Sequence, residues 1–398
     1  MAKESLLFEK TIKSVIFYLR LIGLSFVNQN DHRRRFFYIY NFFHLNTEVV
    51  CEIVWLIVHM TTTGIDFIEV TYIIPCLSLC FLGNVKALLF LYNMEHVKEL
   101  IRILKESFKS RQSCHVHEKL LWKEFRNMNI IAKIILYINI SGALGFAIIP
   151  WLIFATKYYS TGEIKLVLPF IVSYPFDYTD IRLYLFAYTH QLWTAWVAVL
   201  SVFSPDCFFY ACSASITVLF RTLQYDIEMI EVKKFIRPNV TDKTLRADFG
   251  KVIHRHKLVI RCVALLEKIC TISNLMNVVI SSFLICATGF NILAMDSLPL
   301  MIPFISFLNQ STIQIFILCY YGDQIMRSSM ELSNAIYRCK WYNSNAAAMK
   351  DFLFILIRTQ KPCTITAYGF TIINLRAFMK ILSTAWSYFA LLTTLYRK

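Results

Sequence analysis

Apolar residues fall into seven long stretches of the chain, separated by segments in which Lys, Arg and other polar residues are concentrated. Each stretch is close to the ~20 residues that an α-helix needs to cross ~30 Å of hydrocarbon. The pattern therefore predicts an all-α protein with seven transmembrane helices. The predicted spans are 38–59, 71–92, 130–156, 184–205, 272–294, 298–320 and 376–396.

The composition supports insertion into a membrane. Of the 398 residues, 57% are hydrophobic and 17% are charged, and the mean hydropathy is +0.52, whereas a soluble domain is usually about 45–50% apolar. No linker rich in Gly, Ser or Pro and no repeat divides the chain, so we expect one membrane domain over 1–398. No cleaved signal peptide is evident before the first span, which we expect to act as the insertion signal.

The distribution of basic residues predicts the orientation of the chain. Alternate segments between the spans hold 31 Lys and Arg on one side and five on the other. Because basic residues favour the cytoplasmic side, the N-terminus is expected in the cytoplasm and the C-terminus outside the cell. Receptors that couple to G proteins have the opposite orientation, so no G protein is expected as a partner.

The net charge of +15 comes from Lys and Arg that lie between apolar spans. A compact basic face would be needed to hold nucleic acid, so we expect no nucleic-acid partner. Attraction to anionic membrane lipid is the better interpretation.

Two of the predicted helices are longer than the bilayer is thick. The helical pattern runs over 183–231 and over 243–294, and both excess lengths fall on the predicted cytoplasmic side. Segment 322–368 adds amphipathic stretches there, including NAAAMKDFLFILIR. We therefore expect a cytoplasmic anchor built from these helices, with 38–320 carrying six spans and an outer pocket, and 321–398 carrying an anchor helix and the last span.

Signatures of catalysis and of metal binding are missing from the sequence. There is no P-loop, no GxGxxG and no G-x-S-x-G, so we expect neither an enzyme nor a cofactor. The pairs His115-x-His117 and His254-x-His256 have no ligand pattern around them, and we interpret them as parts of solvated basic loops. None of the 12 cysteines lies in an outer segment, so no extracellular disulfide is expected.

Several charged residues lie in or near the predicted spans, where a charge is costly and often functional. Glu48 and Glu52 are four residues apart, so they share one face of the first span. Either an interhelical polar contact or a pathway role accounts for them. Lys86 lies near a cytoplasmic span end, where its ammonium can extend to the interface, and Asp206 follows Pro205 at a possible helix kink.

The outer halves of spans two, three, four and six mix small or hydroxyl-bearing residues with large apolar ones. Such walls suit a small, mostly hydrophobic ligand, although the same pattern is typical of close helix packing, which it favours when taken alone. Segment 157–183 contains VSYPFDYTD and is a candidate lid. The candidate ligand-binding residues are Cys76, Leu77, Ser141, Gly145, Phe146, Ile149, Tyr188, Leu192, Trp196, Phe304, Phe307 and Leu308.

The last predicted helix carries a polar stripe. Steps of three and four residues keep Lys380, Thr384, Ser387, Leu391, Thr394 and Lys398 on one face. A polar face toward lipid is unfavourable, so it must face protein or water. Hydroxyl groups around one apolar constriction are typical of a hydrophobically gated pore shared by several copies. Polar packing inside a single bundle accounts for the pattern equally well.

The C-terminal third resembles the signature of insect odorant receptors. The match begins at Gly322-Asp323-Gln324, and its residues lie within about 320–398. The remaining matching residues are Ser329, Leu332, Ala335, Tyr337, Trp341, Arg358, Pro362-Cys363, Ile365-Thr366-Ala367, Phe378 and Ser387-Tyr388-Phe389. Gustatory receptors, which are related, commonly have Thr-Tyr-X-X-X-X-Gln-Phe where this chain has Ser-Tyr-Phe-Ala-Leu-Leu, so the odorant receptors match better.

The resemblance implies an odorant-binding subunit that assembles with the common co-receptor into a heterotetrameric, odorant-gated, nonselective cation channel. It implies a small volatile apolar ligand in the outer pocket, the last helix along the pore, and Leu391 at the gate. It also implies the plasma membrane of olfactory sensory dendrites. Segment 221–261 is short, which points to a tuning subunit and not the co-receptor. A gustatory channel, a self-sufficient homomeric channel and a transporter are the alternatives.

Overall fold

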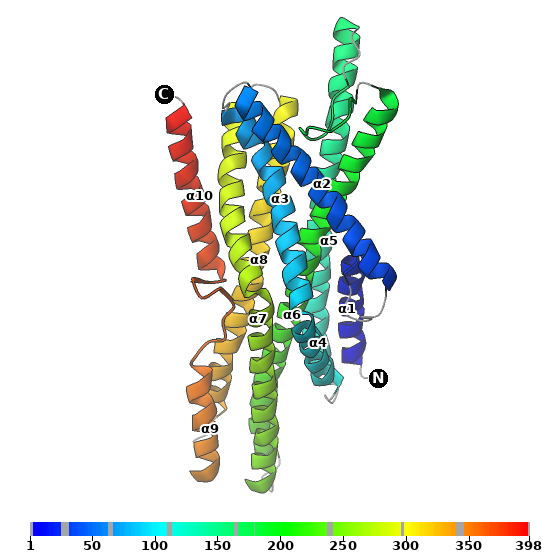
Figure 1. Cartoon of the computed structure of the whole chain (residues 1–398). Helices are drawn as coiled ribbons and strands as arrows, with labels where there is room; N and C mark the ends of the chain where they lie inside the picture. Colours follow the sequence, from blue (N-terminus) through cyan, green and yellow to red (C-terminus); the bar gives the residue numbers. More distant parts are fainter. Residues whose placement is uncertain are drawn as a thin grey trace.

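The structure is a computed structural model that describes residues 3–24, 32–62, 67–109, 114–162, 166–178, 180–236, 242–295, 298–339 and 346–396. Within these ranges it contains ten α-helices and one two-stranded hairpin (Figure 1). The helices are α1 (Lys3–Leu21), α2 (His32–Thr62), α3 (Phe67–Tyr92), α4 (Met94–Lys109), α5 (His115–Thr161), α6 (Ile181–Ile236), α7 (Asp242–Ala294), α8 (Leu298–Arg338), α9 (Ala346–Thr359) and α10 (Leu375–Tyr396), and the strands are β1 (Thr366–Ala367) and β2 (Thr371–Ile372).

The all-α fold is confirmed. Among the described residues, six helices are long and apolar enough to cross a membrane, and they contain the first six predicted spans: α2, α3, α5, α6, α7 and α8. The seventh predicted span forms α10. That helix is not among the six, because Lys380 and its Ser and Thr residues dilute its apolar side chains.

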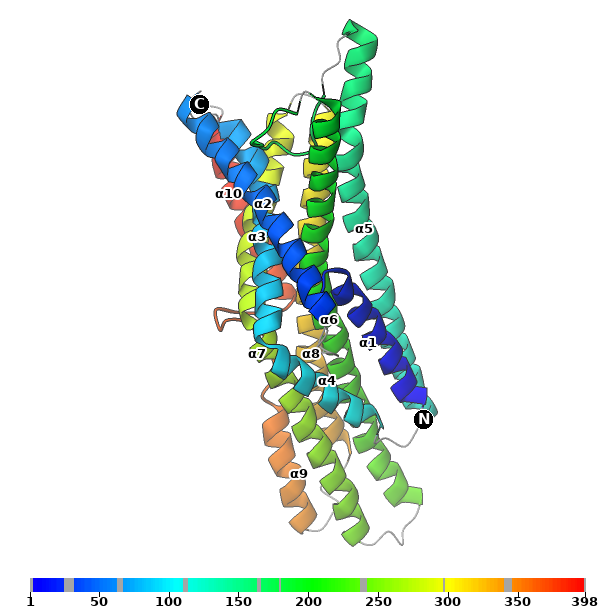
Figure 2. The same ribbon diagram turned by 45° about the vertical axis from the view of Figure 1, so that its right-hand side comes forward.

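The predicted long helices are confirmed as well. Helix α6 has 56 residues and α7 has 53, so at ~1.5 Å per residue both are about 80 Å long. They extend together past the rest of the bundle toward the end that is lowest in Figure 1, where α8 ends and α9 lies (Figures 1 and 2). This projecting part corresponds to the expected anchor, and its cytoplasmic location stays a prediction.

Two short helices, α1 and α4, were not predicted from the sequence because neither is apolar enough to resemble a span. Both are amphipathic. Helix α4 buries Val97, Leu100 and Leu104, which repeat at helical spacing, and α1 buries Val15 and Leu19. They pack against each other and cover α5, α6 and α7 on one side of the bundle (Figure 2).

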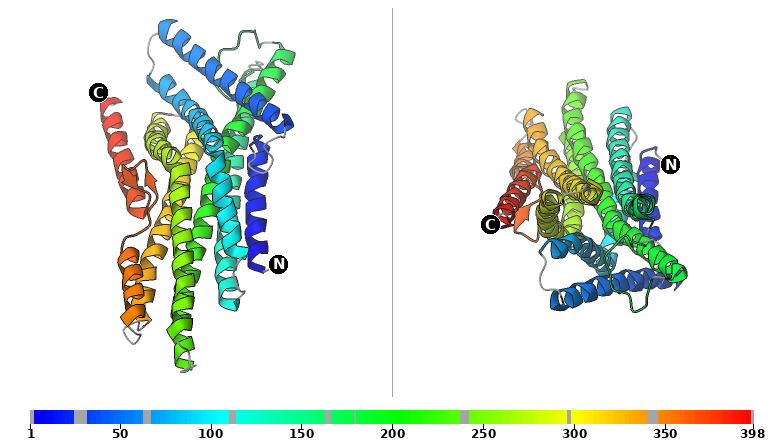
Figure 3. Two further views of the ribbon diagram at one scale, coloured as in Figure 1. Left: turned by 60° about the horizontal axis from the view of Figure 1, so that its bottom comes forward. Right: turned by 90° about the horizontal axis from the view of Figure 1, so that it is seen from above.

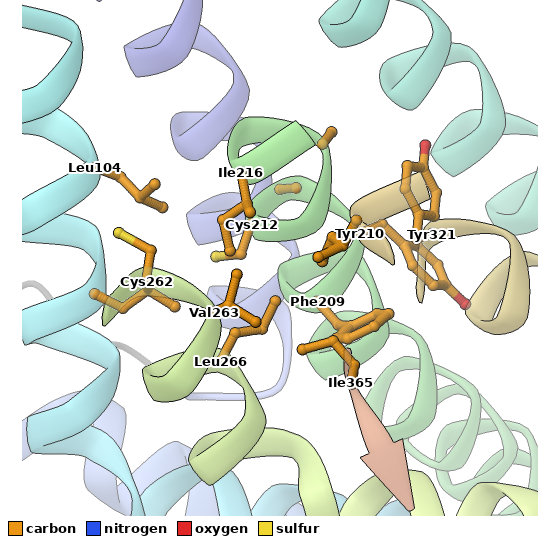
Figure 4. Close-up of a cluster of buried hydrophobic side chains, with 14 of the residues drawn as sticks. Leu104, Phe209, Tyr210, Cys212, Ile216, Cys262, Val263, Leu266, Tyr321 and Ile365 are labelled. Atoms are coloured by element: carbon orange, nitrogen blue, oxygen red, sulfur yellow. The ribbon is translucent and has the colours of Figure 1, made fainter. Parts of the chain in front are cut away.

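The largest hydrophobic core lies where α4, α6, α7, α8 and the hairpin segment meet. Figure 4 shows Leu104, Ile216 and Cys262 on three of these helices turned toward one another. The rings of Tyr210 on α6 and Tyr321 on α8 stack with centroids 5.3 Å apart. Dense packing of this kind makes the centre of the bundle a rigid support for the elements around it.

Helix α10 lies at one edge of the molecule, as the view from above shows (Figure 3). It packs against α7 and α8 only along its inner face, through Ala377, Ile381 and Ala385, which are buried. Its outer face has no neighbour among the described residues of this chain.

Candidate functional site

A cavity lies among α2, α3, α5, α6 and α8, with about 570 Å³ of empty space. Most of its wall is apolar. The lining residues are Glu48, Glu52, Cys76, Leu79, Cys80, Asn139, Gly142, Ala143, Phe146, Phe170, Thr194, Ala195, Ala198, Val199, Ser306, Phe307 and Gln310.

Three phenylalanines from distant parts of the chain form one aromatic wall. Phe146 on α5 stacks on Phe170 with ring centroids 5.1 Å apart, and meets Phe307 on α8 edge to face at 5.2 Å. Phe170 belongs to the 157–183 segment that was predicted to cover the pocket. Its backbone N–H donates to Gln191 Oε1 at 3.0 Å, and Gln191 Nε2 donates back to its carbonyl at 3.2 Å. These paired bonds hold the loop against α6.

Another part of the wall is acidic. Glu48 and Glu52 are each 3% exposed and both line the cavity. One Glu48 oxygen, Oε2, accepts a hydrogen bond from the hydroxyl of Tyr174 at 3.2 Å and lies 3.1 Å from His190 Nδ1. The other imidazole nitrogen of His190 lies 3.2 Å from Thr47 Oγ1. The lid segment is therefore also tied to α2 through Tyr174.

Three of the twelve predicted pocket residues line this cavity: Cys76, Phe146 and Phe307. The other nine do not. Among them, Tyr188 donates to the carbonyl of Ala147 and accepts from Trp151, while Phe304 packs its ring against Tyr72 and Trp196 packs on the main core. Ser141 is exposed and bonds to the carbonyl of Ile138. The remaining five, which are partly buried, are Leu77, Gly145, Ile149, Leu192 and Leu308.

All four helices that the sequence pattern selected contribute to this cavity, but three of the twelve predicted residues lie on its wall. Small residues such as Ala143 on α5 and Ala195 and Ala198 on α6 also line the cavity. Most of their neighbours in the sequence are apolar too, so the pattern did not indicate which helix face would line a cavity. Glu48 and Glu52 were noted as unusual, yet were not assigned to the pocket. Their shared helix face was the available signal for the contribution of α2.

Lys86 does not extend to the membrane interface, so that prediction from the sequence was wrong. It is buried and donates to both carboxylate oxygens of Asp206, at 2.7 Å each. Gln314 Nε2 donates to Asp206 at 2.8 Å and lies 3.3 Å from Asn277 Oδ1. Burial of a charged lysine is tolerated here because its counter-ion is equally buried and held by further hydrogen bonds.

The histidine pairs lie on helices, so their interpretation as parts of solvated loops was wrong. His117 is buried on α5 with Nε2 3.1 Å from Asp226, and His256 is buried on α7 while His254 is exposed. Spacing of two places each pair on different faces, as expected for a helix. Among the described residues, no group of three or more His, Cys, Asp or Glu is arranged to hold a metal.

The predicted pore stripe lies on the outer face of α10. Lys380, Thr384, Ser387, Leu391 and Thr394 are all exposed, and Leu391 retains 54% of its accessible surface. Lys398 lies outside the described residues. The hydroxyls of Thr384 and Ser387 donate to carbonyls one turn earlier, at 2.9 Å each. Polar packing within this chain therefore does not account for the stripe, since these residues face away from its own helices.

The C-terminal motif residues join α8 to the segment that leads into α10. A Cβ on Gly322 would lie 2.2 Å from the carbonyl oxygen of Ile373, so only glycine fits. Ser329 Oγ accepts from the N–H of Cys363 at 3.0 Å. Glu267 on α7 accepts from the N–H of Thr366 at 2.8 Å and from its hydroxyl. Trp341 of the motif lies outside the described residues.

Five of the six helices that are long and apolar enough to cross a membrane line this cavity. The family described as 7tm Odorant receptor matches residues 66–386. The chain therefore belongs to the insect odorant receptor family.

Individual relatives agree with this assignment. The chain is 26% identical to the Putative odorant receptor 92a of Drosophila melanogaster, over 99% of this chain and 97% of that protein, and 22% identical to Odorant receptor 85c of the same species, over 90% of each. The solved olfactory receptor OR5 from Machilis hrabei in complex with eugenol has a TM-score of 0.84, with 16% identity, and covers 99% of this chain and 100% of that one. Another structure of OR5 has a TM-score of 0.80 with 98% and 99% coverage. These structures share the fold of this chain.

Proposed function

We propose that this chain is the odorant-binding subunit of a ligand-gated, nonselective cation channel in the plasma membrane, formed with the common co-receptor of the family. The observation that carries the proposal is the outer face of α10, where hydroxyl-bearing residues and Leu391 are exposed on a helix whose inner face is packed. A polar face is unfavourable against lipid. Other subunits that bring equivalent helices around a common axis would place it against water.

The ligand-binding part of the proposal rests on the cavity among α2, α3, α5, α6 and α8. A small volatile molecule enters the apolar space beside Phe146, Phe170 and Phe307. It favours the open arrangement by binding it more tightly than the closed one. Opening removes Leu391 from the pore axis, and cations pass with little selection, because the described part of the pore face carries no ring of carboxylates.

The route from cavity to pore helix runs through α7 and α8. Gln310 lines the cavity and also a second hollow that reaches Asp206 and Gln314. Asn274 on α7 donates to the carbonyl of Thr366 at 3.4 Å, and Thr366 lies in the segment that leads into α10. A ligand that shifts α7 against α8 would move the attachment of α10.

The test is whole-cell current across an odorant panel, from cells that express this chain alone, this chain with the co-receptor, the co-receptor alone, and neither. We expect an odorant-evoked cation current that requires both chains. In olfactory neurons we expect the chain in the dendritic membrane. Current from this chain alone would support a homomeric channel. Responses to tastants but not to volatiles would support a gustatory receptor.

A further inference from the structure

The acidic part of the cavity wall has hydrogen-bond acceptors that the protein leaves without donors. Glu48 Oε1, Glu52 Oε2 and Asn139 Oδ1 are buried, belong to residues that line the cavity, and have no hydrogen-bond partner among the described residues. Buried polar atoms are nearly always paired in proteins, since an unpaired one costs about 1–3 kcal/mol. Three such acceptors around one cavity indicate that the partner is a ligand that donates hydrogen bonds.

The protein also supplies little positive charge to these carboxylates. None of the described residues that line the cavity is Lys, Arg or His. His190 reaches Glu48, but through Oε2 and not through the unpartnered Oε1, and its second nitrogen is engaged by Thr47. The two glutamates lie one helical turn apart on α2. Two carboxylates at this spacing repel each other when both are ionised, so a cation between them is stabilised by both.

The aromatic wall suits the same kind of ligand. Phe146, Phe170 and Phe307 present ring surface to the cavity, and the faces of aromatic rings attract organic cations. A neutral alcohol provides a single donor and no charge. A primary ammonium provides three N–H donors and a positive charge, while its alkyl chain occupies the apolar remainder of the cavity.

From this geometry we infer that the cavity selects small protonated amines, with Glu52 as the principal counter-ion and Glu48 as a second acceptor. The inference rests on the proposed function of the cavity as the odorant site, and it names the chemical class of the odorant. The selection is electrostatic: the carboxylates are already desolvated in the folded protein, so a bound ammonium gains their attraction and offsets its own loss of water.

The experiment compares n-hexylamine with 1-hexanol, which has the same chain length, in cells that express this chain with the co-receptor. An alkylamine has a pKa close to that of lysine, about 10, and is protonated at neutral pH. We expect hexylamine to activate at a concentration about 10- to 100-fold lower than hexanol, as for a charge-assisted hydrogen bond. Glu52→Gln should remove this preference, because it should lower the response to hexylamine much more than the response to hexanol.

The matched control is Glu106→Gln, which removes one negative charge from an exposed i,i+4 pair with Arg102 on α4. It should leave both responses unchanged. Surface labelling accompanies each variant, and Glu52→Asp, which keeps the charge, should retain the preference for the amine.

The wild-type comparison alone can overturn the inference, without relying on any variant. Equal or stronger activation by hexanol would exclude amine selection while leaving the proposed odorant-gated channel intact. A Glu52→Gln variant that lowers both responses equally would assign Glu52 to folding or gating and also overturn the inference. Failure of every volatile in the odorant panel, with both chains at the cell surface, would instead contradict the proposed function itself.

Discussion

Lys86 on α3 donates to both carboxylate oxygens of Asp206 on α6, at 2.7 Å each, and both residues are buried inside the bundle. Gln314 on α8 donates to the same carboxylate at 2.8 Å. One acidic side chain therefore connects three helices that also line the cavity described above. Polar connections of this kind fix the relative positions of helices more specifically than apolar packing, and a loss of either partner leaves an uncompensated charge.

Replacement of Lys86 by Met should destabilise the chain by about 3–5 kcal/mol, because Asp206 is left buried without a counter-ion. Asp206→Asn should have a similar effect. The double variant should recover most of the loss, since no charge remains and the amide introduced at position 206 can still accept from Gln314. The midpoint of thermal unfolding in detergent measures all three. A double variant as unstable as the sum of the single variants would show that the two residues act independently.

Gly322 on α8 is predicted to tolerate no side chain. The carbonyl oxygen of Ile373 would lie 2.2 Å from an added Cβ, so Gly322→Ala must push the segment before α10 away from α8. We expect a loss of about 1–3 kcal/mol, as for overpacking in a core. The effect is read as a lower unfolding midpoint and a smaller fraction of chain at the cell surface.

Gly250→Ala is the control for this substitution. Gly250 is an exposed residue within α7 and has no atom within 4 Å of an added Cβ. Alanine should therefore raise stability there by up to about 1 kcal/mol, because it is the better helix former. If both alanines destabilise equally, the close approach at Gly322 is not the cause.

The sequence predicted the helices well, but it indicated few of the residues that line the cavity. The spans are visible because runs of about twenty apolar residues rarely occur outside membrane helices, and the long helix α6 is visible because its pattern continues for many turns. The sequence does not show which face each helix turns to the cavity. In α6, for example, apolar residues occur on every face, and neighbours that are distant in the chain decide which of them line the cavity. Phe146 and Phe307 were found as large residues beside small ones, whereas Phe170 depended on the path of a loop.

Charged residues show the same limit. Lys86 and Asp206 are 120 positions apart, and only the packing of α3 on α6 brings them together. From the sequence alone, each was interpreted locally, one as an extended lysine and the other as part of a helix kink. The acidic pair Glu48 and Glu52 was recognisable because both partners lie on one helix, where spacing of four residues is enough to place them on one face.

The stability of the projecting helices should fall in mild acid because of His256, which lies outside the predicted span at 272–294. Burial lowers the pKa of His256 to about 4, and the guanidinium of Arg358 acts in the same direction. The unfolded chain, with an ordinary histidine pKa near 6.5, binds the proton more readily. Stability from this residue is therefore complete above about pH 6.5 and is lost as the pH falls toward 4, by at most about 3 kcal/mol.

Unfolding midpoints measured between pH 7 and pH 4 test this prediction, with His256→Phe and His254→Gln as the two variants. The first should flatten the pH dependence, because it removes the buried imidazole. The second should not change it, since His254 is exposed on the same helix. An unchanged pH profile in His256→Phe would assign the acid sensitivity to other groups.

Leu391 is the only apolar residue among the exposed stripe positions described on α10, Lys380, Thr384, Ser387, Leu391 and Thr394. In a shared pore, a ring that includes this side chain would exclude water and stop ions when the channel is closed. Leu391→Ala should shorten the apolar side chain and let water enter the closed pore. The expected result is a resting current several-fold above wild type without odorant, recorded in cells that also express the co-receptor and normalised to labelled surface protein.

Leu392→Ala is the matched control, because Leu392 is partly buried and lies off the stripe, and its resting current should equal that of wild type. Equal resting currents in Leu391→Ala and wild type, at equal surface expression, would place the gate elsewhere on the helix.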